Sequence, residues 1–296
     1  MLRPACLQPG DKVALVSPAG AISREAIVTA THLLRSWGLV PVPGKHAESR
    51  YGYFAGTDAE RMHDLQWALD DEEIRAIFCT RGGYGCLRIV EDLDYSIFQG
   101  NPKWLVGFSD ITVLHTKLTS LGIESLHGPM PKSYSSTTPD ALEKLKNFLF
   151  GDITPYQFPP HPFNREGIVR ADLTGGNLCL LHCIRSSSIE YPYKDAILFI
   201  EDVGENLYAL DRMMQSFKLS GRLHHLQGLI VGGFNEMKGE DFGKNAYEII
   251  RECIDEFDFP VCFGFPAGHI PDNYPLILGS HIELSIDEKG TEITFL

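Results

Sequence analysis

The sequence of 296 residues has no apolar run of the roughly 18 residues that a membrane span requires. Residues 1–10 also lack the apolar core of a secretion signal. Runs of lysine or arginine are missing too, and the net charge is -13. Because nucleic acids and anionic membranes are bound through basic patches, we expect neither as a partner. We predict a cytoplasmic protein that acts on a small, diffusible substrate.

Cysteine is sparse and supplies neither a disulfide framework nor a metal site. The seven cysteines are scattered singly along the chain, as is typical of proteins from a reducing compartment. Cys179, His182 and Cys183 lie close together, but their predicted helix is apolar nearly all round and no fourth ligand follows at a recognisable spacing. We interpret these three residues as core packing. The motif H-E-x-x-H is absent as well, and we expect no metal and no cofactor.

The order of predicted elements is that of an α/β protein. Hydrophobic residues make up 44% and charged residues 22% of the chain, which is ordinary for a globular protein. The chain opens with a predicted strand over 13–17, a helix over 23–37 and a second strand over 39–42. Such a strand-helix-strand unit favours a parallel sheet. A glycine-rich turn then follows a strand over 76–80, at the sheet edge where ligands bind in such folds.

The length predicts two domains, because a single core usually spans about 100 to 200 residues. Periodicity is lost between residues 151 and 167, where prolines and aromatic residues accumulate. We therefore place a linker over 151–167, between a first domain over 1–150 and a second α/β domain over 168–296.

One stretch, W-L-V-G-F-S-D at 104–110, contains a candidate nucleophile. An apolar run long enough for a buried strand breaks at a glycine and delivers Ser109 just before a predicted helix over 111–121. In a nucleophile elbow, such a turn lifts the serine hydroxyl clear of the sheet. The N–H of Asp110, at the helix start, is available to stabilise an oxyanion. The second glycine of G-x-S-x-G is missing, and Ser109 also suits a plain helix cap.

Two further residues have the chemistry that a serine nucleophile requires. His269 lies in a loop rich in glycine and proline, where side chains often face a binding site, and it is a candidate base. Glu201 ends an apolar strand, and a partly buried carboxylate there would orient the base. His127 also ends an apolar run and competes for the role of base. The alternatives are a surface histidine at 269 and a solvated strand end at 201.

The glycine-rich turn R-G-G-Y-G at 81–85 is open to two interpretations. It could cradle a phosphate, but it departs from G-x-G-x-x-G, and no acidic residue ends a strand about 20 residues later as a ribose ligand would. It could instead lend the backbone N–H of Gly83 to an oxyanion hole beside Ser109. Arg81 is either a partner for a substrate carboxylate, because its fork matches two oxygens, or a structural arginine that holds the loop.

Five motifs, taken in order, resemble the LD-carboxypeptidase family of serine peptidases, and the likeness spans nearly the whole chain. They are R-G-G-Y-G at 81–85, V-G-F-S-D at 106–110, L-H-G-P at 126–129, F-I-E-D-V-G-E at 199–205 and G-F-P-A-G-H at 264–269. The resemblance implies a catalytic triad of Ser109, Glu201 and His269. It also implies cleavage of an L,D peptide bond, typically release of the terminal D-Ala from murein tetrapeptides in cytoplasmic recycling, so that the partner is a small peptide or muropeptide.

The resemblance implies a fold as well: a Rossmann-like (flavodoxin-like) amino-terminal domain with a parallel sheet and a smaller α/β carboxyl-terminal domain. It further implies a site between the two domains, usually in a homodimer. One departure follows His269, where this chain reads I-P-D-N-Y-P-L-I-L-G and many members have a Leu-Pro step before the last glycine. That departure affects the local loop and its substrate contacts and leaves the triad intact.

Two other functions remain open from the sequence. A related branch, the microcin C immunity peptidases, uses the same triad to cleave an acyl-sulfamate or acyl-phosphoramidate link to a nucleotide, although the turn at Arg81 looks more like the murein-recycling branch. A different class is a non-catalytic module that binds a nucleotide or a peptide, because Ser109 and the 82–85 turn can both be interpreted as ordinary helix starts.

Overall fold

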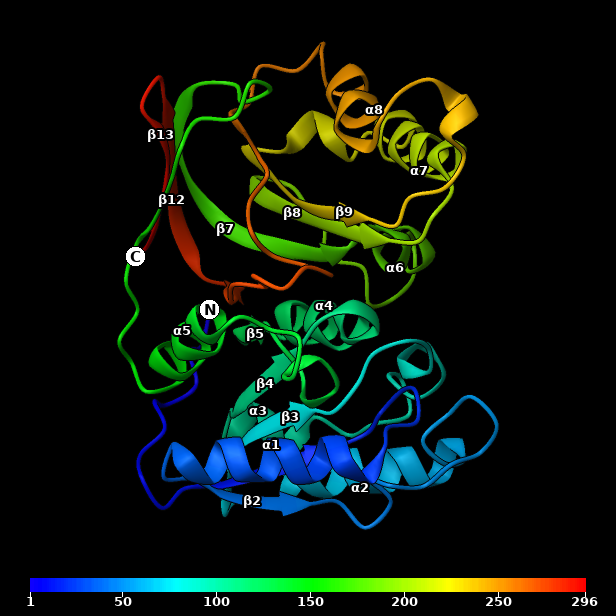
Figure 1. The fold of residues 1–296 in the computed structure, drawn as a ribbon, viewed down its shortest axis with the longest axis vertical. Coiled ribbons are helices and arrows are strands. Elements are labelled where there is room, and N and C mark those ends of the chain that lie inside the picture. The colour runs from blue at the N-terminus through cyan, green and yellow to red at the C-terminus, as the bar shows by residue number, and fades with distance from the viewer.

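The computed structural model describes residues 1–296 with the exception of the Glu240 side chain. Two α/β units lie one above the other in Figure 1, and each is built around its own sheet. Helices α4 (Thr112–Ser120) and α5 (Pro139–Leu149) lie between the two sheets. This arrangement confirms the predicted two-domain α/β class.

The first sheet has the strand order β11-β5-β4-β3-β1-β2. Its strands are β1 (Lys12–Val16), β2 (Val40–Pro43), β3 (Ile74–Cys79), β4 (Trp104–Gly107), β5 (Ser125–His127) and β11 (Leu276–Leu278). Strands β1 to β5 pair in parallel, whereas β11 pairs with β5 in antiparallel fashion. The parallel part has the order 2-1-3-4-5 of flavodoxin-like sheets, which confirms the Rossmann-like first unit.

The three longest helices of the first unit, α1, α2 and α5, begin at a side-chain cap. The helices of this unit are α1 (Arg24–Ser36), α2 (Asp58–Asp70), α3 (Ser96–Gly100), α4, α5 and the short 3-10 helices η1 (Cys86–Arg88), η2 (Ser109–Ile111) and η3 (Pro131–Ser133). Ser23 caps α1, and Thr57 and Glu60 form a reciprocal capping box at the start of α2. These side chains satisfy N–H groups that have no partner within the helix.

The second sheet has the order β10-β9-β8-β7-β12-β13-β6. Its parallel strands are β7 (Gly167–Asn177), β8 (Ala196–Val203), β9 (Gly228–Asn235) and β10 (Val261–Phe263), and its antiparallel strands are β12 (His281–Asp287), β13 (Gly290–Phe295) and β6 (Tyr156–Phe158). The helices of this unit are α6 (Leu178–Cys183), α7 (Leu207–Leu219), α8 (Ala246–Cys253), η4 (Leu223–His225) and η5 (Glu240–Phe242).

The chain does not pass from one sheet to the other at a single point. Strand β6 lies inside the segment 151–167, for which we expected only a linker, and it pairs with β13 in the second sheet. Strand β11 lies inside 168–296 but belongs to the first sheet. The carboxyl-terminal half therefore completes the edge of the amino-terminal sheet.

The two units also share their hydrophobic core and meet closely at one point. A single buried cluster includes Ile111 of the first unit and Leu178 of the second. Asn177 N donates a hydrogen bond of 2.9 Å to Thr112 Oγ1, across the boundary between the units. Gly176 makes this approach possible, because a methyl group there would lie 2.9 Å from Thr112 Cγ2. The end of β7 is thereby joined to the start of α4.

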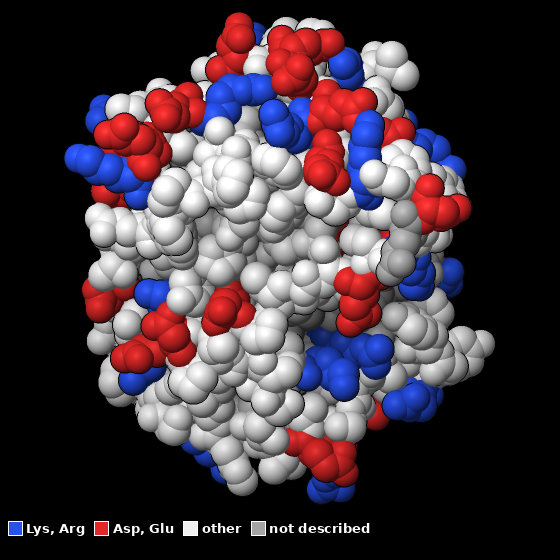
Figure 2. Space-filling model, turned by 45° about the horizontal axis from the view of Figure 1, so that its top comes forward, with Lys and Arg blue, Asp and Glu red and all other residues white. Residues whose placement is uncertain are grey.

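No helix among the residues that the structure describes is both long and apolar enough to cross a membrane. Figure 2 shows one face of the molecule, on which acidic and basic side chains alternate around a broad uncharged area. Basic side chains gather at one hollow on this face. The mixture of both signs means that this face presents no extended basic surface.

Gly175 in β7 is a position at which the fold should tolerate no side chain. Its φ is 132°, and a methyl group there would overlap the backbone carbonyl of Phe199 in β8. We expect Gly175→Ala to lower the free energy of unfolding by at least about 2 kcal/mol. Gly100→Ala, where a methyl group meets nothing within 4 Å, should change it by less than about 1 kcal/mol. Urea unfolding followed by tryptophan fluorescence measures both, and equal stabilities would contradict the argument.

Candidate active site

Ser109 lies on a sharp turn at the carboxyl end of β4. Phe108 is extended, with φ at -153° and ψ at -172°, and Ser109 then takes a φ of 63°, in the left-handed region that residues other than glycine seldom adopt. Gly107 permits the turn, because a methyl group there would lie 2.8 Å from the side chain of Ile111. The chain continues directly into η2 and α4. The turn that we expected at a nucleophile elbow is present, with backbone strain at the serine itself.

The glycine-rich turn after β3 contacts this serine directly. A methyl group on Gly82 would lie 2.8 Å from Ser109 Cβ, 2.9 Å from Ser109 Oγ and 3.2 Å from Asp110 N. Gly83 follows with a φ of 99°. The carboxyl ends of β3 and β4 therefore bring Gly82 next to both the Ser109 hydroxyl and the N–H of Asp110. The oxyanion hole formed by Gly83 and Asp110 stays a prediction.

His269 and Glu201 form a hydrogen-bonded pair in the second unit. His269 Nδ1 donates to Glu201 Oε2 at 2.7 Å, and the Glu201 side chain is fully buried near the carboxyl end of β8. Gly268 lets the loop after β10 approach this carboxylate, because a methyl group there would lie 2.8 Å from Glu201 Cβ. The hydrogen bond at Nδ1 leaves Nε2 of the imidazole available to act as a base.

The histidine pair and the serine turn meet at Phe108. The rings of Phe108 and His269 pack edge to face, with their centres 4.8 Å apart. Among the hydrogen bonds that the structure describes, none joins Ser109 Oγ to His269. In substrate-free enzymes, such bonds are often long and shorten when substrate binds. The imidazole of His269 is 22% exposed, so a substrate has access to it.

Two opposing effects set the pKa of His269. Burial of the ring lowers the pKa, but the charge of Glu201 and the hydrogen bond to it raise the pKa, so the result lies above the ordinary value of 6.5. Asp202, next to Glu201, has its pKa raised to about 7 by burial and by the Glu201 charge. Its carboxylate accepts hydrogen bonds from Asn177 Nδ2 and Cys179 N, both at 2.9 Å. Asp202 thus anchors the start of α6.

His127, the competing base, is completely buried and serves a structural role. Its pKa falls to about 3, chiefly because of burial, so the ring is neutral. The ring packs between Phe108 and Phe199, and its Nε2 donates to Asn273 Oδ1 at 3.3 Å. Asn273 Oδ1 also accepts from Gly268 N at 2.7 Å. His127 therefore supports the loop that carries His269.

Arg61 is a site residue that the sequence did not reveal. Its side chain is fully buried, and Nη1 donates to the carbonyl oxygens of Pro18 and Gly85, while Nη2 pairs with Asp58. The guanidinium thus ties the turn after β1 to the glycine-rich turn after β3. The sequence gives no signal for this role, because the position follows a helix cap and reads as ordinary helix.

Arg81 and Tyr53 border the same turn. Arg81 Nη1 donates to Ala21 O, and its guanidinium lies 5.8 Å from the centre of the Tyr53 ring. The hydroxyl of Tyr53 stands so close to Gly83 that a methyl group on this glycine would overlap it. Arg81 therefore does hold the loop, as one of the two interpretations expected.

The interpretation of Cys179, His182 and Cys183 as core packing is wrong for Cys183. Helix α6 buries Leu178 and Leu181, whereas Cys183 is exposed and Cys179 is half-buried. The physical reason is that α6 packs against the protein on the face that carries Leu178 and Leu181, so the opposite face, which carries Cys183, is exposed to solvent.

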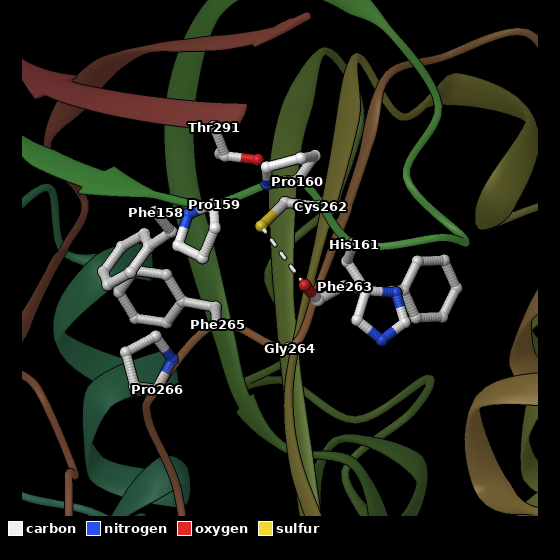
Figure 3. Close-up of a pocket in the computed structure, with 10 residues that line it drawn as sticks. All are labelled: Phe158, Pro159, Pro160, His161, Cys262, Phe263, Gly264, Phe265, Pro266 and Thr291. Carbon is white, nitrogen blue, oxygen red and sulfur yellow. Dashed lines mark hydrogen bonds between the residues drawn. The ribbon is translucent and has the colours of Figure 1, made fainter. Parts of the chain in front are cut away.

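A pocket of about 260 Å³ lies beside the loop that leads to His269 (Figure 3). Its walls are aromatic rings and prolines from the segments around Phe158 and Phe265, and His161 stacks on Phe263 with ring centres 5.8 Å apart. Neither Ser109 nor Glu201 lines it. The pocket is therefore separate from the candidate catalytic residues.

A strained serine beside backbone N–H groups, with a histidine held by a buried carboxylate, is the chemistry of a serine hydrolase. Comparison with known proteins gives the family. Residues 13–128 match the family model of the LD-carboxypeptidase N-terminal domain, and residues 170–284 match that of the LD-carboxypeptidase C-terminal domain. The chain therefore belongs to the LD-carboxypeptidase family, which confirms the resemblance, and it is a serine carboxypeptidase.

Individual relatives agree with this assignment. A putative carboxypeptidase from Synechocystis is 34% identical over 100% of this chain and 97% of its own length, and the murein tetrapeptide carboxypeptidase of Pseudomonas aeruginosa is 32% identical over 90% and 91%. The crystal structure of muramoyltetrapeptide carboxypeptidase from Oxalobacter formigenes has a TM-score of 0.88, 26% identity and coverage of 95% and 97%. The microcin C7 self-immunity protein has a TM-score of 0.89 at 23% identity over 100% and 99%, which shows the fold alone.

The environment of His269 predicts an unusual titration. We expect its imidazole to titrate above pH 6.5 in the folded protein, because Glu201 favours the protonated ring. Glu201→Gln removes that charge and leaves the burial, so the pKa should fall. NMR of the ring protons across a pH series measures the shift, with Glu205→Gln, on the loop after β8, as the matched control. A titration that is the same in both variants would contradict the assignment.

Proposed function

We propose that this chain is a murein tetrapeptide LD-carboxypeptidase that releases the terminal D-Ala in the cytoplasmic recycling of cell-wall peptides. The observation that supports it most is that Phe108, which directly precedes Ser109, packs on the ring of His269, and that His269 is hydrogen-bonded to Glu201. The relatives named as murein and muramoyltetrapeptide carboxypeptidases support the choice of substrate.

In the first half of the reaction, Ser109 Oγ attacks the carbonyl carbon of the L,D peptide bond. Its proton passes to Nε2 of His269, while Glu201 holds Nδ1–H and stabilises the imidazolium. The N–H groups of Asp110 and Gly83 donate to the oxygen that becomes negative. The tetrahedral intermediate then collapses, and the proton on His269 goes to the departing amine of D-Ala.

In the second half, a water molecule hydrolyses the ester that links the tripeptide to Ser109. His269 again takes a proton, now from water, and returns it to Ser109 Oγ as the ester breaks. The buried carboxylate of Glu201 favours the protonated ring in both halves, because an opposite charge at hydrogen-bonding distance stabilises the imidazolium. One side-chain set therefore serves both steps.

Arg81 is the candidate for recognition of the terminal carboxylate of the substrate. Its Nη1 is committed to Ala21 O, but the structure describes no protein partner for Nη2, and the residue directly precedes the Gly82–Gly83 turn. A guanidinium can hold a loop with one nitrogen and bind a carboxylate with the other. We infer that Arg81 contributes to binding the carboxylate of D-Ala in this way.

Two features of the biological setting belong to the same proposal. We propose action in the cytoplasm on peptides recycled from the wall, on the strength of the resemblance to the LD-carboxypeptidase family. We also propose a homodimer, on the strength of the family resemblance.

Substitution of the proposed nucleophile or base should remove turnover. We expect Ser109→Ala and His269→Ala to lower the rate by about 10⁴ to 10⁶ with the fold retained, as judged by circular dichroism. His127→Gln is the matched control and should keep most of the activity, because that ring is buried and neutral. Release of D-Ala from a tetrapeptide measures the rate. Loss of turnover in the His127 variant alone would move the base to His127.

The stereochemistry of the substrate separates this proposal from its alternatives. An inverted Cα moves the carboxylate away from its partner, and an unmet charged hydrogen bond costs about 1 to 3 kcal/mol. We expect cleavage at D-Ala to be at least about tenfold faster than at L-Ala, with Arg81→Ala mainly raising KM and the control Arg88→Ala leaving it unchanged. Equal rates on both isomers would overturn the proposed LD-carboxypeptidase activity.

The remaining alternatives predict different outcomes in parallel assays. Cleavage of an aminoacyl sulfamoyl nucleoside with no action on tetrapeptides would identify a microcin-type peptidase. Tight binding of a nucleotide or peptide, with Ser109 inert to a serine-directed phosphonate, would identify a non-catalytic binding module.

A further inference from the structure

A group of metal-binding side chains lies on elements that carry none of the proposed catalytic residues. Glu60, His63 and Asp64 occupy positions i, i+3 and i+4 of α2, so they share one face of the helix. His46 comes from the loop that follows β2. Two imidazoles and two carboxylates therefore meet between a helix and a loop.

The distances among His46, His63 and Asp64 suit a single ion, and Glu60 lies next to His46. Ligand atoms of His46, His63 and Asp64 all lie within 4.8 Å of one another. His63 Nδ1 is 3.1 Å from Asp64 Oδ1, and His46 Nδ1 is 3.5 Å from Glu60 Oε1. Bonds of about 2.0 to 2.2 Å to a tetrahedral zinc ion place ligand atoms roughly 3.3 to 3.6 Å apart. Small rotations of the side chains are enough to reach that spacing.

Both carboxylates of the group, those of Asp64 and Glu60, are held in place by hydrogen bonds from the backbone. Asp64 is buried, with 3% of its side chain exposed, and its Oδ2 accepts from His46 N at 2.6 Å. Gly44 permits this contact, because a methyl group there would overlap the carboxylate. Glu60 Oε2 accepts from Thr57 N at 2.7 Å, while Oε1 faces His46. Prior fixing of ligands in this way favours metal binding.

We propose that Glu60, His63, Asp64 and His46 bind one divalent transition-metal ion, with Zn²⁺ as the best match. Imidazole nitrogen and carboxylate oxygen are ordinary zinc ligands, and two imidazoles select against Mg²⁺ and Ca²⁺, which prefer oxygen. The two carboxylates neutralise the charge of the ion. The His63 side chain is 56% exposed, which gives the ion access from solvent.

The ion fastens a loop that borders the proposed active site. The loop that contains His46 continues to Tyr53, where Ala21 N donates to Tyr53 O at 3.1 Å and Ala55 N donates to Ala19 O at 3.0 Å. Tyr53 in turn stands against Gly83. Coordination of His46 to α2 therefore restrains the far end of the segment that forms a wall beside the glycine-rich turn. The ion has a structural role and takes no part in the proposed reaction.

The test is titration of the full-length protein, first stripped with a chelator, with Zn²⁺ and with Co²⁺ as a coloured probe. We expect one equivalent to bind and the melting temperature to rise. His63→Ala and His46→Gln should each weaken binding by about tenfold or more. The matched control is His281→Ala, because His281 also pairs with a carboxylate, Asp172 at 2.8 Å, but lies outside the group.

A second control addresses the thiols of α6, which also have affinity for Zn²⁺. Cys183→Ser should leave the stoichiometry and the affinity unchanged, and the Co²⁺ spectrum should lack a thiolate charge-transfer band. The stripped enzyme should keep most of its turnover, since the ion is structural. No binding to the wild type, binding that survives loss of both histidines, or binding that depends on Cys183 would each overturn the proposal.

Discussion

The hydrogen bond between His269 and Glu201 is the contact on which the arrangement of the site depends. Glu201 is fully buried, and its other oxygen, Oε1, has no hydrogen-bond partner among the described atoms, so His269 supplies the polar contact that such a carboxylate requires. In return, the carboxylate fixes the orientation of the ring. The last residues of β8, which include Glu201, and the histidine loop therefore fix each other's positions.

Buried polar residues hold the loops on both sides of this contact. Asn273 joins Gly268 to His127 on the histidine side, and Arg61 joins Pro18 to Gly85 on the serine side. Each of these side chains bonds to backbone groups of turns at the ends of strands. The reacting groups lie on loops, and hydrogen bonds from buried side chains hold these loops against the rest of the fold.

The sequence predicted the parts of the molecule that have a local signal. Alternation of apolar strands and helices predicted the parallel sheet, and the motifs around Ser109, Glu201 and His269 predicted which residues would meet, of which the Glu201–His269 bond is observed. Strands β6 and β11 were missed because three residues next to prolines carry no periodicity. The roles of Arg61 and Asn273 depend on contacts between distant segments, which no local pattern records.

The return of β11 to the first sheet has a consequence for the synthesis of the protein. The outer edge of β5 has no strand beside it until residues 276–278 have left the ribosome, although the rest of that sheet is complete at residue 127. An unpaired edge is a template for pairing with other chains. The edge of β5 in the nascent amino-terminal half therefore stays unpaired until almost the whole polypeptide has been synthesised. Premature termination would leave a fragment with this exposed edge, which favours aggregation.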